Sequence, residues 1–217
     1  MRYTTPFEIR VPNNPRSSEA LALAYGILEQ QDRVDESLES FTEKLKAKKD
    51  LKIVFGFWTE GVSGKAQIQQ GAKISGEKPK AVSVLVGYEC HDGFGLRGEL
   101  DGGSSDDEGW TNVTKPFYLI CRTLEGHQGK GIVSTLVNYV DRRLSDYTHM
   151  CASENLGVST AKVFTKLGFE DFERSSFQPL VQSVDSLVEE ISGLEDTSDR
   201  ISFTEERVRW IRRRLVA

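Results

Sequence analysis

The stretch PFYLICRTLEGHQGKGIVSTLVNYV, residues 116–140, decides the predicted fold. Its first part, Phe117 to Arg122, is a mostly apolar run of strand length. A glycine-rich turn follows over Glu125 to Gly131. The apolar residues after the turn recur at helical spacing, and they are Ile132, Val133, Leu136, Val137, Val140 and Leu144. The stretch therefore predicts a strand, a glycine-rich turn and an amphipathic helix in succession.

The predicted turn can form an anion-binding site. A helix whose first turn contains Gly129, Lys130 and Gly131 leaves its first backbone N–H groups unpaired and unobstructed. A Walker loop needs Ser or Thr directly after the lysine, where Gly131 stands, and a Rossmann fingerprint needs a third glycine where Ser134 stands. Neither nucleotide motif fits.

The residues before this stretch predict a strand, two helices and two further strands. The first strand is Phe7 to Val11, and Ser17 or Ser18 caps the helix that follows. Leu38, Phe41 and Leu45 form the apolar face of the second helix. The two strands are Ile53 to Trp58 and Val82 to Tyr88, separated by a loop or a ragged hairpin.

An acidic, Gly-rich segment, residues 93–109, predicts a surface loop within an insertion over 93–115, because it offers almost nothing apolar to bury. A lid or collar for cationic substrates is its functional alternative. Met150 to Ser153 and Phe169 to Phe177 are expected to be strands, with a helix over Ser159 to Leu167 that Gly168 ends.

The tail, residues 179–217, is expected to be a helical hairpin. Its first apolar stripe runs from Leu180 to Leu194, and its second consists of Val208, Ile211 and Leu215. Five arginines crowd the second helix, and they are Arg207, Arg209, Arg212, Arg213 and Arg214. One interpretation is that these arginines form the solvent-exposed end of the helix. The alternative is that they bind an acidic partner, an RNA or a CoA phosphate.

Composition bounds the class of protein. The chain has 217 residues with a net charge of −5, which suits one soluble globular domain with an appendage and argues against nucleic acid as a partner. No run approaches the roughly 18 apolar residues of a membrane span. Three cysteines without ligand spacing favour neither disulfides nor a metal. We expect a cytoplasmic protein, with the nucleus as the alternative.

Two motifs resemble the GNAT superfamily of acetyl-CoA-dependent N-acetyltransferases. Gln128 to Leu136 is similar to its pyrophosphate loop, Arg/Gln-x-x-Gly-x-Gly/Ala, and Asn155 with Phe164 to Phe169 to its second motif, an Asn followed by Tyr-x-x-x-Gly-Phe. The element order matches as well. The resemblance implies an α/β (α+β) GNAT fold, a mixed sheet flanked by helices, over residues 1–178, with 179–217 as a helical extension.

The resemblance also implies which residues hold acetyl-CoA. The pantetheine arm bonds to main chain around Cys121 to Thr123, and the pyrophosphate lies on the N–H groups of residues 129–134. Lys130 is a counter-charge, and Gln128 shapes the loop. The cofactor-binding residues are then Cys121, Thr123, Gln128, Gly129, Lys130, Gly131, Val133, Ser134, Asn155 and Phe164. No metal is implied.

The resemblance implies a reaction in which the primary amine of a small molecule or a peptide attacks the thioester of acetyl-CoA. Glu89 and Glu125 are the catalytic candidates for the base, with His127 as a third. Phe164 departs from the family because it replaces the tyrosine that protonates the thiolate in many members. The alternative is therefore an inactive module that binds acyl-CoA or a protein. The helical tail is expected to serve as a dimer or partner surface.

Overall fold

The computed structural model describes residues 7–30, 36–59, 68–71, 80–89, 94–97, 110–113, 116–147, 149–153, 158–171, 177–179 and 208–213. The chain divides into two compact units. Unit 1 comprises Met1–Tyr88, Leu119–Leu144 and Ile201–Glu205. Unit 2 comprises Glu89–Tyr118, Ser145–Arg200 and Glu206–Ala217. None of the described helices has the length and apolar character needed to cross a membrane.

The described residues of unit 1 form strands and three helices. Its elements are β1 (Phe7–Val11), α1 (Ser18–Glu29), α2 (Leu38–Ala47), β2 (Lys52–Trp58), β3 (Ile68–Gln70), most of β4 (Lys80–Glu89), the later part of β7 (Pro116–Thr123) and α3 (Ile132–Asp141). Its strands follow the order β3-β1-β2-β4-β7. The β1–β2 and β2–β4 pairs are antiparallel, and the β1–β3 pair is parallel. This unit therefore has the mixed α/β character expected from the sequence.

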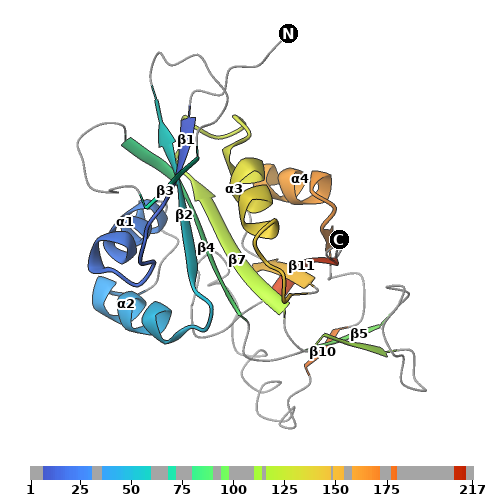
Figure 1. The fold of residues 1–217 in the computed structure, drawn as a ribbon. Helices are drawn as coiled ribbons and strands as arrows, with labels where there is room; N and C mark the ends of the chain where they lie inside the picture. Colours follow the sequence, from blue (N-terminus) through green and yellow to red (C-terminus); the bar gives the residue numbers. More distant parts are fainter. Residues whose placement is uncertain are drawn as a thin grey trace. The chain divides into compact units, whose positions relative to one another are not determined.

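Helices cover both faces of these strands. α1 and α2 lie on one side of β2 and β4, and α3 lies on the other (Figure 1). The hydroxyl of Ser17 accepts the N–H of Ala20 at the start of α1, and that of Ser37 caps α2. The two helices meet edge to face at Tyr25 and Phe41, with ring centroids 5.4 Å apart.

The start of α3 is fixed by a close approach to β2. A Cβ built on Gly56 of β2 would lie 2.6 Å from Cγ2 of Ile132, the first residue of α3. Ile132 is buried, and so are the apolar residues Leu136, Val137 and Val140 one and two turns later. Because only a glycine allows this approach, Gly56 helps to position the helix N-terminus and the turn before it.

Unit 2 contains the remaining elements. They are β5 (Phe94–Arg97), β6 (Trp110–Val113), β8 (His149–Ser153), α4 (Val158–Lys166), β9 (Glu170–Asp171), β10 (Phe177–Pro179) and β11 (Val208–Arg213). β11 pairs antiparallel with both β8 and β9, and β5 pairs antiparallel with both β6 and β10. The element order that the sequence predicts from the first strand to α4 is confirmed, with the short strands β3, β5 and β6 added.

The predicted helix at the end of the chain is wrong. Val208–Arg213 is the strand β11, whose two edges bond to β8 and β9. Val208, Trp210 and Ile211 have high strand propensity, and pairing on two sides outweighs the helical spacing of the apolar residues. The expected dimer surface on a helical hairpin thus loses its second helix. The first predicted helix of that hairpin lies outside the described residues.

Two smaller expectations also change. Strands β5 and β6 lie in the insertion that was expected to be a loop, and each has the alternating or β-branched residues of a strand. The single strand expected over Phe169 to Phe177 is replaced by the short strands β9 and β10. The acidic residues between β5 and β6 lie outside the described residues.

Candidate functional site

The candidate site is built on the turn between β7 and α3, residues 124–131, which we call the glycine turn. Gly126, Gly129 and Gly131 have φ values of 80°, 72° and 77°, in the left-handed region. A Cβ added at any of the three would meet nothing within 4 Å. These glycines therefore allow the left-handed backbone conformation and leave the backbone accessible to a ligand, and packing does not require them. The sequence predicted this for Gly129 and Gly131.

The helix that follows starts without a side-chain cap. Gly131 is the N-cap of α3, and no side chain bonds to the first N–H groups there. The N–H of Thr135 bonds to the carbonyl of Gly131 at 3.2 Å, so regular helical bonding starts at that residue. Val133 and Ser134 are half-buried, whereas residues 128–131 are exposed. An uncapped helix start beside open glycines attracts anions, because N–H dipoles point outward from it.

The strand that enters the turn has one edge on β4. The N–H of Leu124 donates to the carbonyl of Val82 at 2.8 Å. Alternate residues of a strand direct their backbone groups to opposite edges. Arg122 therefore faces β4 together with Leu124, and the backbone groups of Cys121 and Thr123 face the other edge of β7.

Side chains hold the carbonyl groups at this end of β7. The Ser83 hydroxyl donates to the carbonyl of Arg122 at 2.7 Å and lies 2.8 Å from the hydroxyl of Thr123. At the other edge, the Arg122 guanidinium donates to the carbonyl of Cys121 at 2.9 Å. The Gln128 amide donates to the carbonyl of Thr123 at 3.4 Å. Thr123 and Gln128, two of the predicted site residues, are thus brought together.

Trp58, at the end of β2, contacts the glycine turn. Its ring lies 4.8 Å from the His127 ring in an edge-to-face arrangement, and the Lys130 ammonium lies 4.2 Å from its centroid. That ammonium also donates to the carbonyl of Gly126 at 2.7 Å. Burial, helped by the charges of Lys130 and Lys80, lowers the pKa of His127 below its usual value. The neutral form of His127 is therefore favoured.

Cys121 has no chemistry of its own at this site. Its side chain is 1% exposed, and burial raises the pKa of its thiol to about 12, although Arg122 acts in the opposite direction. A thiol with such a pKa stays protonated and unreactive at neutral pH. Cys121 can therefore contribute only backbone groups, and the resemblance implies a role for its main chain alone.

The predicted base candidates lie in different settings. Glu89 is the last residue of β4 and half-buried, and its carboxylate accepts a hydrogen bond from the Tyr147 hydroxyl at 3.0 Å. Glu89 belongs to unit 2, seven residues along β4 from Val82. Glu125 is exposed in the glycine turn itself.

The second predicted motif is packed in unit 2. Phe164 of α4 is 0% exposed, and its ring lies edge to face against Phe169 at 4.6 Å. Gly168 has the left-handed φ of 80° predicted for a residue that ends a helix. Asn155 lies outside the described residues. Among the described residues, no cluster of His, Cys, Asp or Glu forms a metal site.

Sequence reasoning missed Ser83 and the roles of Arg122 and Trp58. A serine in a buried strand and a tryptophan at a strand end carry no local signal of contact with residues far away in the chain. Only the pairing of β2, β4 and β7 brings Ser83 to the end of β7 and Trp58 to the glycine turn. Trp58 packs against His127 and Lys130.

No family model matches the chain, and no curated protein matches it in sequence. Solved structures of similar fold include NAA60 of Arabidopsis thaliana in complex with acetyl-CoA, at 13% identity and a TM-score of 0.47 over 76% of this chain and 85% of that one. Aminoglycoside acetyltransferase AAC(6')-Ib in complex with coenzyme A aligns at 14% identity over 76% and 84%, with a TM-score of 0.41. The NatC complex bound to Gag peptide and CoA aligns at 12% identity over 80% and 99%, with a TM-score of 0.46. No activity follows from likenesses this distant.

Proposed function

We propose that this chain is a GNAT-type N-acetyltransferase that transfers an acetyl group from acetyl-CoA to a primary amine. The observation that carries the proposal is the glycine turn, with its three left-handed glycines at the uncapped start of α3. The predicted element order around the turn supports it. The acceptor is a small molecule or a peptide with a free amine.

In this proposal the pyrophosphate of acetyl-CoA accepts hydrogen bonds from backbone N–H groups of residues 129–134. Gly129 and Gly131 let the phosphates approach the chain, and Val133 and Ser134 contribute N–H groups of the first helical turn. Gln128 shapes the turn through its bond to the carbonyl of Thr123. The open conformation and the helix dipole together favour an anionic ligand.

The pantetheine arm is proposed to follow the edge of β7 at Cys121 and Thr123. The carbonyl groups of these residues already accept bonds from Arg122 and Gln128. A carbonyl oxygen has a second lone pair, so each can also accept a bond from a pantetheine amide. The two side chains therefore shape this edge without closing it to a ligand.

The reaction needs one base and a stable leaving group. The amine nitrogen attacks the thioester carbonyl, an N–C bond forms, the C–S bond breaks, and the sulfur leaves with the electron pair. The proton from the amine passes to Glu89 or to Glu125, the two carboxylates proposed for this role. A thiol of pKa about 8.5 leaves readily as its anion, so an acid in the place of Phe164 is dispensable.

Titration with acetyl-CoA and an acetylation assay over a panel of amines and peptides test this proposal. We expect saturable binding of acetyl-CoA and transfer to at least one amine. Glu89→Gln and Glu125→Gln identify the base, because its loss lowers kcat by about 100-fold or more and removes the acidic limb of the pH profile. Absence of acetyl-CoA binding would refute the assignment.

The packing of Phe164 favours a second candidate, an acyl-CoA-binding module without catalysis. Phe164 has no hydroxyl, and its ring is fully buried against Phe169. If the protein binds acetyl-CoA but acetylates no amine, and Phe164→Tyr creates turnover, the module is the better description. Thermal unfolding of Phe164→Tyr serves as the control, because a hydroxyl buried there without a partner costs about 1–3 kcal/mol.

A further inference from the structure

The Lys130 side chain is already engaged in the free protein. Its ammonium donates to the carbonyl of Gly126 at 2.7 Å and lies over the Trp58 ring at 4.2 Å. The bond to Gly126 joins residues four apart and closes the glycine turn on itself. A lysine that served chiefly to neutralise a phosphate would extend into solvent instead.

Trp58 contacts the turn at two places. Its ring meets the His127 ring at 4.8 Å and the Lys130 ammonium at 4.2 Å. These two residues flank Gly129, whose left-handed φ opens the backbone to a ligand. The contacts come from β2, which lies next to β4 in the sheet and also carries Gly56 beneath the first residue of α3.

The turn needs such support because of its glycines. Glycine has the largest backbone freedom of any residue, and nothing lies within 4 Å of a Cβ built on any of the three. A turn left to sample many shapes must be ordered when the ligand binds, and that ordering weakens affinity. A turn held beforehand avoids this loss.

We propose that Trp58 is a positioning residue and Lys130 a strut, which together hold the glycine turn in its binding shape before acetyl-CoA arrives. The inference rests on the proposed function for its ligand. Lys130 then acts by fixing backbone N–H groups, and its charge is not the main contact of the phosphates.

A double-mutant cycle tests the coupling of the two residues. The dissociation constant for acetyl-CoA is measured by calorimetry for Trp58→Leu, Lys130→Met and the double variant. We expect each single change to weaken binding by about two- to fivefold, and the double variant to be no weaker than the worse single. Trp58→Phe keeps an aromatic face for the ammonium and should bind within about twofold of wild type. Multiplicative losses, or full affinity in Trp58→Leu, would overturn the inference.

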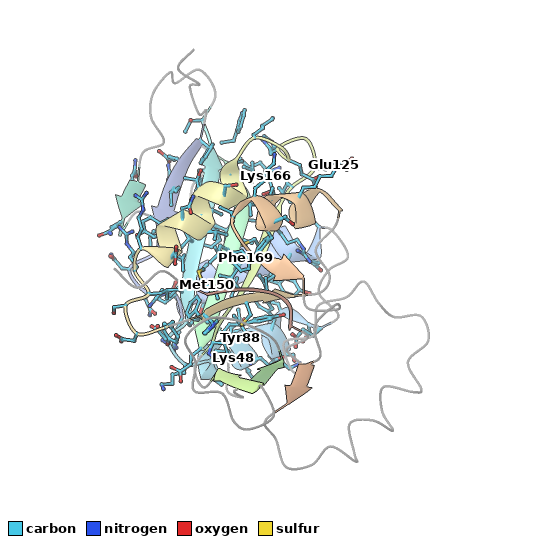
Figure 2. All side chains as sticks on the ribbon, turned by 90° about the vertical axis from the view of Figure 1, so that its right-hand side faces the viewer. Lys48, Tyr88, Glu125, Met150, Lys166 and Phe169 are labelled. Atoms are coloured by element: carbon cyan, nitrogen blue, oxygen red, sulfur yellow. The ribbon has the colours of Figure 1, made fainter. Side chains whose placement is uncertain are left out.

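Lys48 provides a matched control. Its ammonium lies over the Tyr88 ring at 4.5 Å, in the same unit but at the far end of β4 from the turn. Figure 2 shows Lys48 beside Tyr88 at one end of the unit and Glu125 of the turn at the other. Lys48→Met removes a similar contact and should leave affinity unchanged. An equal loss there would show that the effect is general rather than local.

Two further measurements separate the alternatives. Amide hydrogen exchange of residues 126–131 in the free protein should speed up in Trp58→Leu and Lys130→Met but not in Lys48→Met, whether or not acetyl-CoA binds. Unchanged exchange would overturn the strut. If Lys130 instead contacts phosphate, the loss in Lys130→Met shrinks as salt rises and exchange stays the same. Wild type that fails to bind acetyl-CoA refutes the proposed function, and the exchange data still decide the strut.

Discussion

The two motifs that resemble the GNAT superfamily are built in opposite ways. The glycine turn is exposed, and its chemistry lies in backbone N–H groups beside left-handed glycines. In the segment around Phe164, the rings of Phe164 and Phe169 are buried and pack on each other, and the N–H of Phe169 bonds to the carbonyl of Phe164 at 3.0 Å. The first motif offers backbone N–H groups that its conformation exposes, and the second contributes two aromatic rings to the hydrophobic core.

This difference has a functional consequence. A site made of backbone groups survives most side-chain changes, provided that the glycines stay. A site that depends on one hydroxyl is lost when that side chain becomes phenylalanine. We therefore expect ligand binding to depend on the turn and stability to depend on the Phe164 segment, and variants at each can break this division.

The largest expected effect is on stability, in Phe164→Ala. Removal of a fully buried aromatic ring should lower the free energy of unfolding by about 3–5 kcal/mol, because the transfer and cavity costs add. Urea denaturation measures it. Phe164→Leu is the control and should lose much less, since it refills most of the space. A loss below 1 kcal/mol in the alanine variant would mean that this segment is not a packed core.

Gly129→Glu should weaken acetyl-CoA binding by on the order of 100-fold, while leaving most of the stability. The new carboxylate repels phosphates, and the residue must adopt a φ of 72° that L-residues disfavour. Calorimetric titration gives the affinity. Gly26→Glu is the control, because a Cβ on Gly26 in α1 also meets nothing within 4 Å. Equal affinity in both variants would place the ligand elsewhere.

Gly56→Ala should lower both the stability of the protein and its affinity for acetyl-CoA. Its Cβ would lie 2.6 Å from Cγ2 of Ile132, so α3 must shift or the variant loses about 1–3 kcal/mol of stability. Because α3 begins at Ile132, affinity for acetyl-CoA should fall with it. Denaturation and titration of the same sample report the two effects. Gly26→Ala should instead gain up to about 1 kcal/mol, and a Gly56→Ala variant as stable as wild type would contradict the close approach.

The smallest expected effect is a pH dependence from His127. Its pKa is lower in the folded protein than the usual 6.5, so the unfolded chain binds the proton more tightly. The contribution of His127 to the free energy of unfolding is therefore fully present above about pH 6.5. It is lost as the pH falls from there through the folded pKa. The midpoints of urea denaturation at about pH 7.5 and about pH 5.5 measure how strongly stability depends on pH. His127→Gln should weaken this dependence, and an unchanged dependence would assign the effect to other groups.

Much of the fold could be predicted because its causes are local. Ser17, one of the two serines predicted as a cap, caps α1, Gly168 ends α4 in the left-handed region, and the glycine turn lies between β7 and α3. Each of these follows from a residue type at a fixed place relative to an apolar pattern. The prediction failed at Val208–Arg213, where the same apolar residues suit a helix or a strand and the pairing with β8 and β9 decides.

By itself, the sequence determined the helices α1 to α4, the longer strands β1, β2, β4, β7 and β8, and the glycine turn, because propensity, capping and glycine conformation act over a few residues. Only the tertiary structure decided what surrounds the turn. Trp58 reaches it, and Ser83 reaches the end of β7 before it, because β2, β4 and β7 lie in one sheet, and Gly56 fixes the start of α3. Such contacts join residues far apart in the chain, and they exist only once hydrogen bonding and burial have set the strands in register.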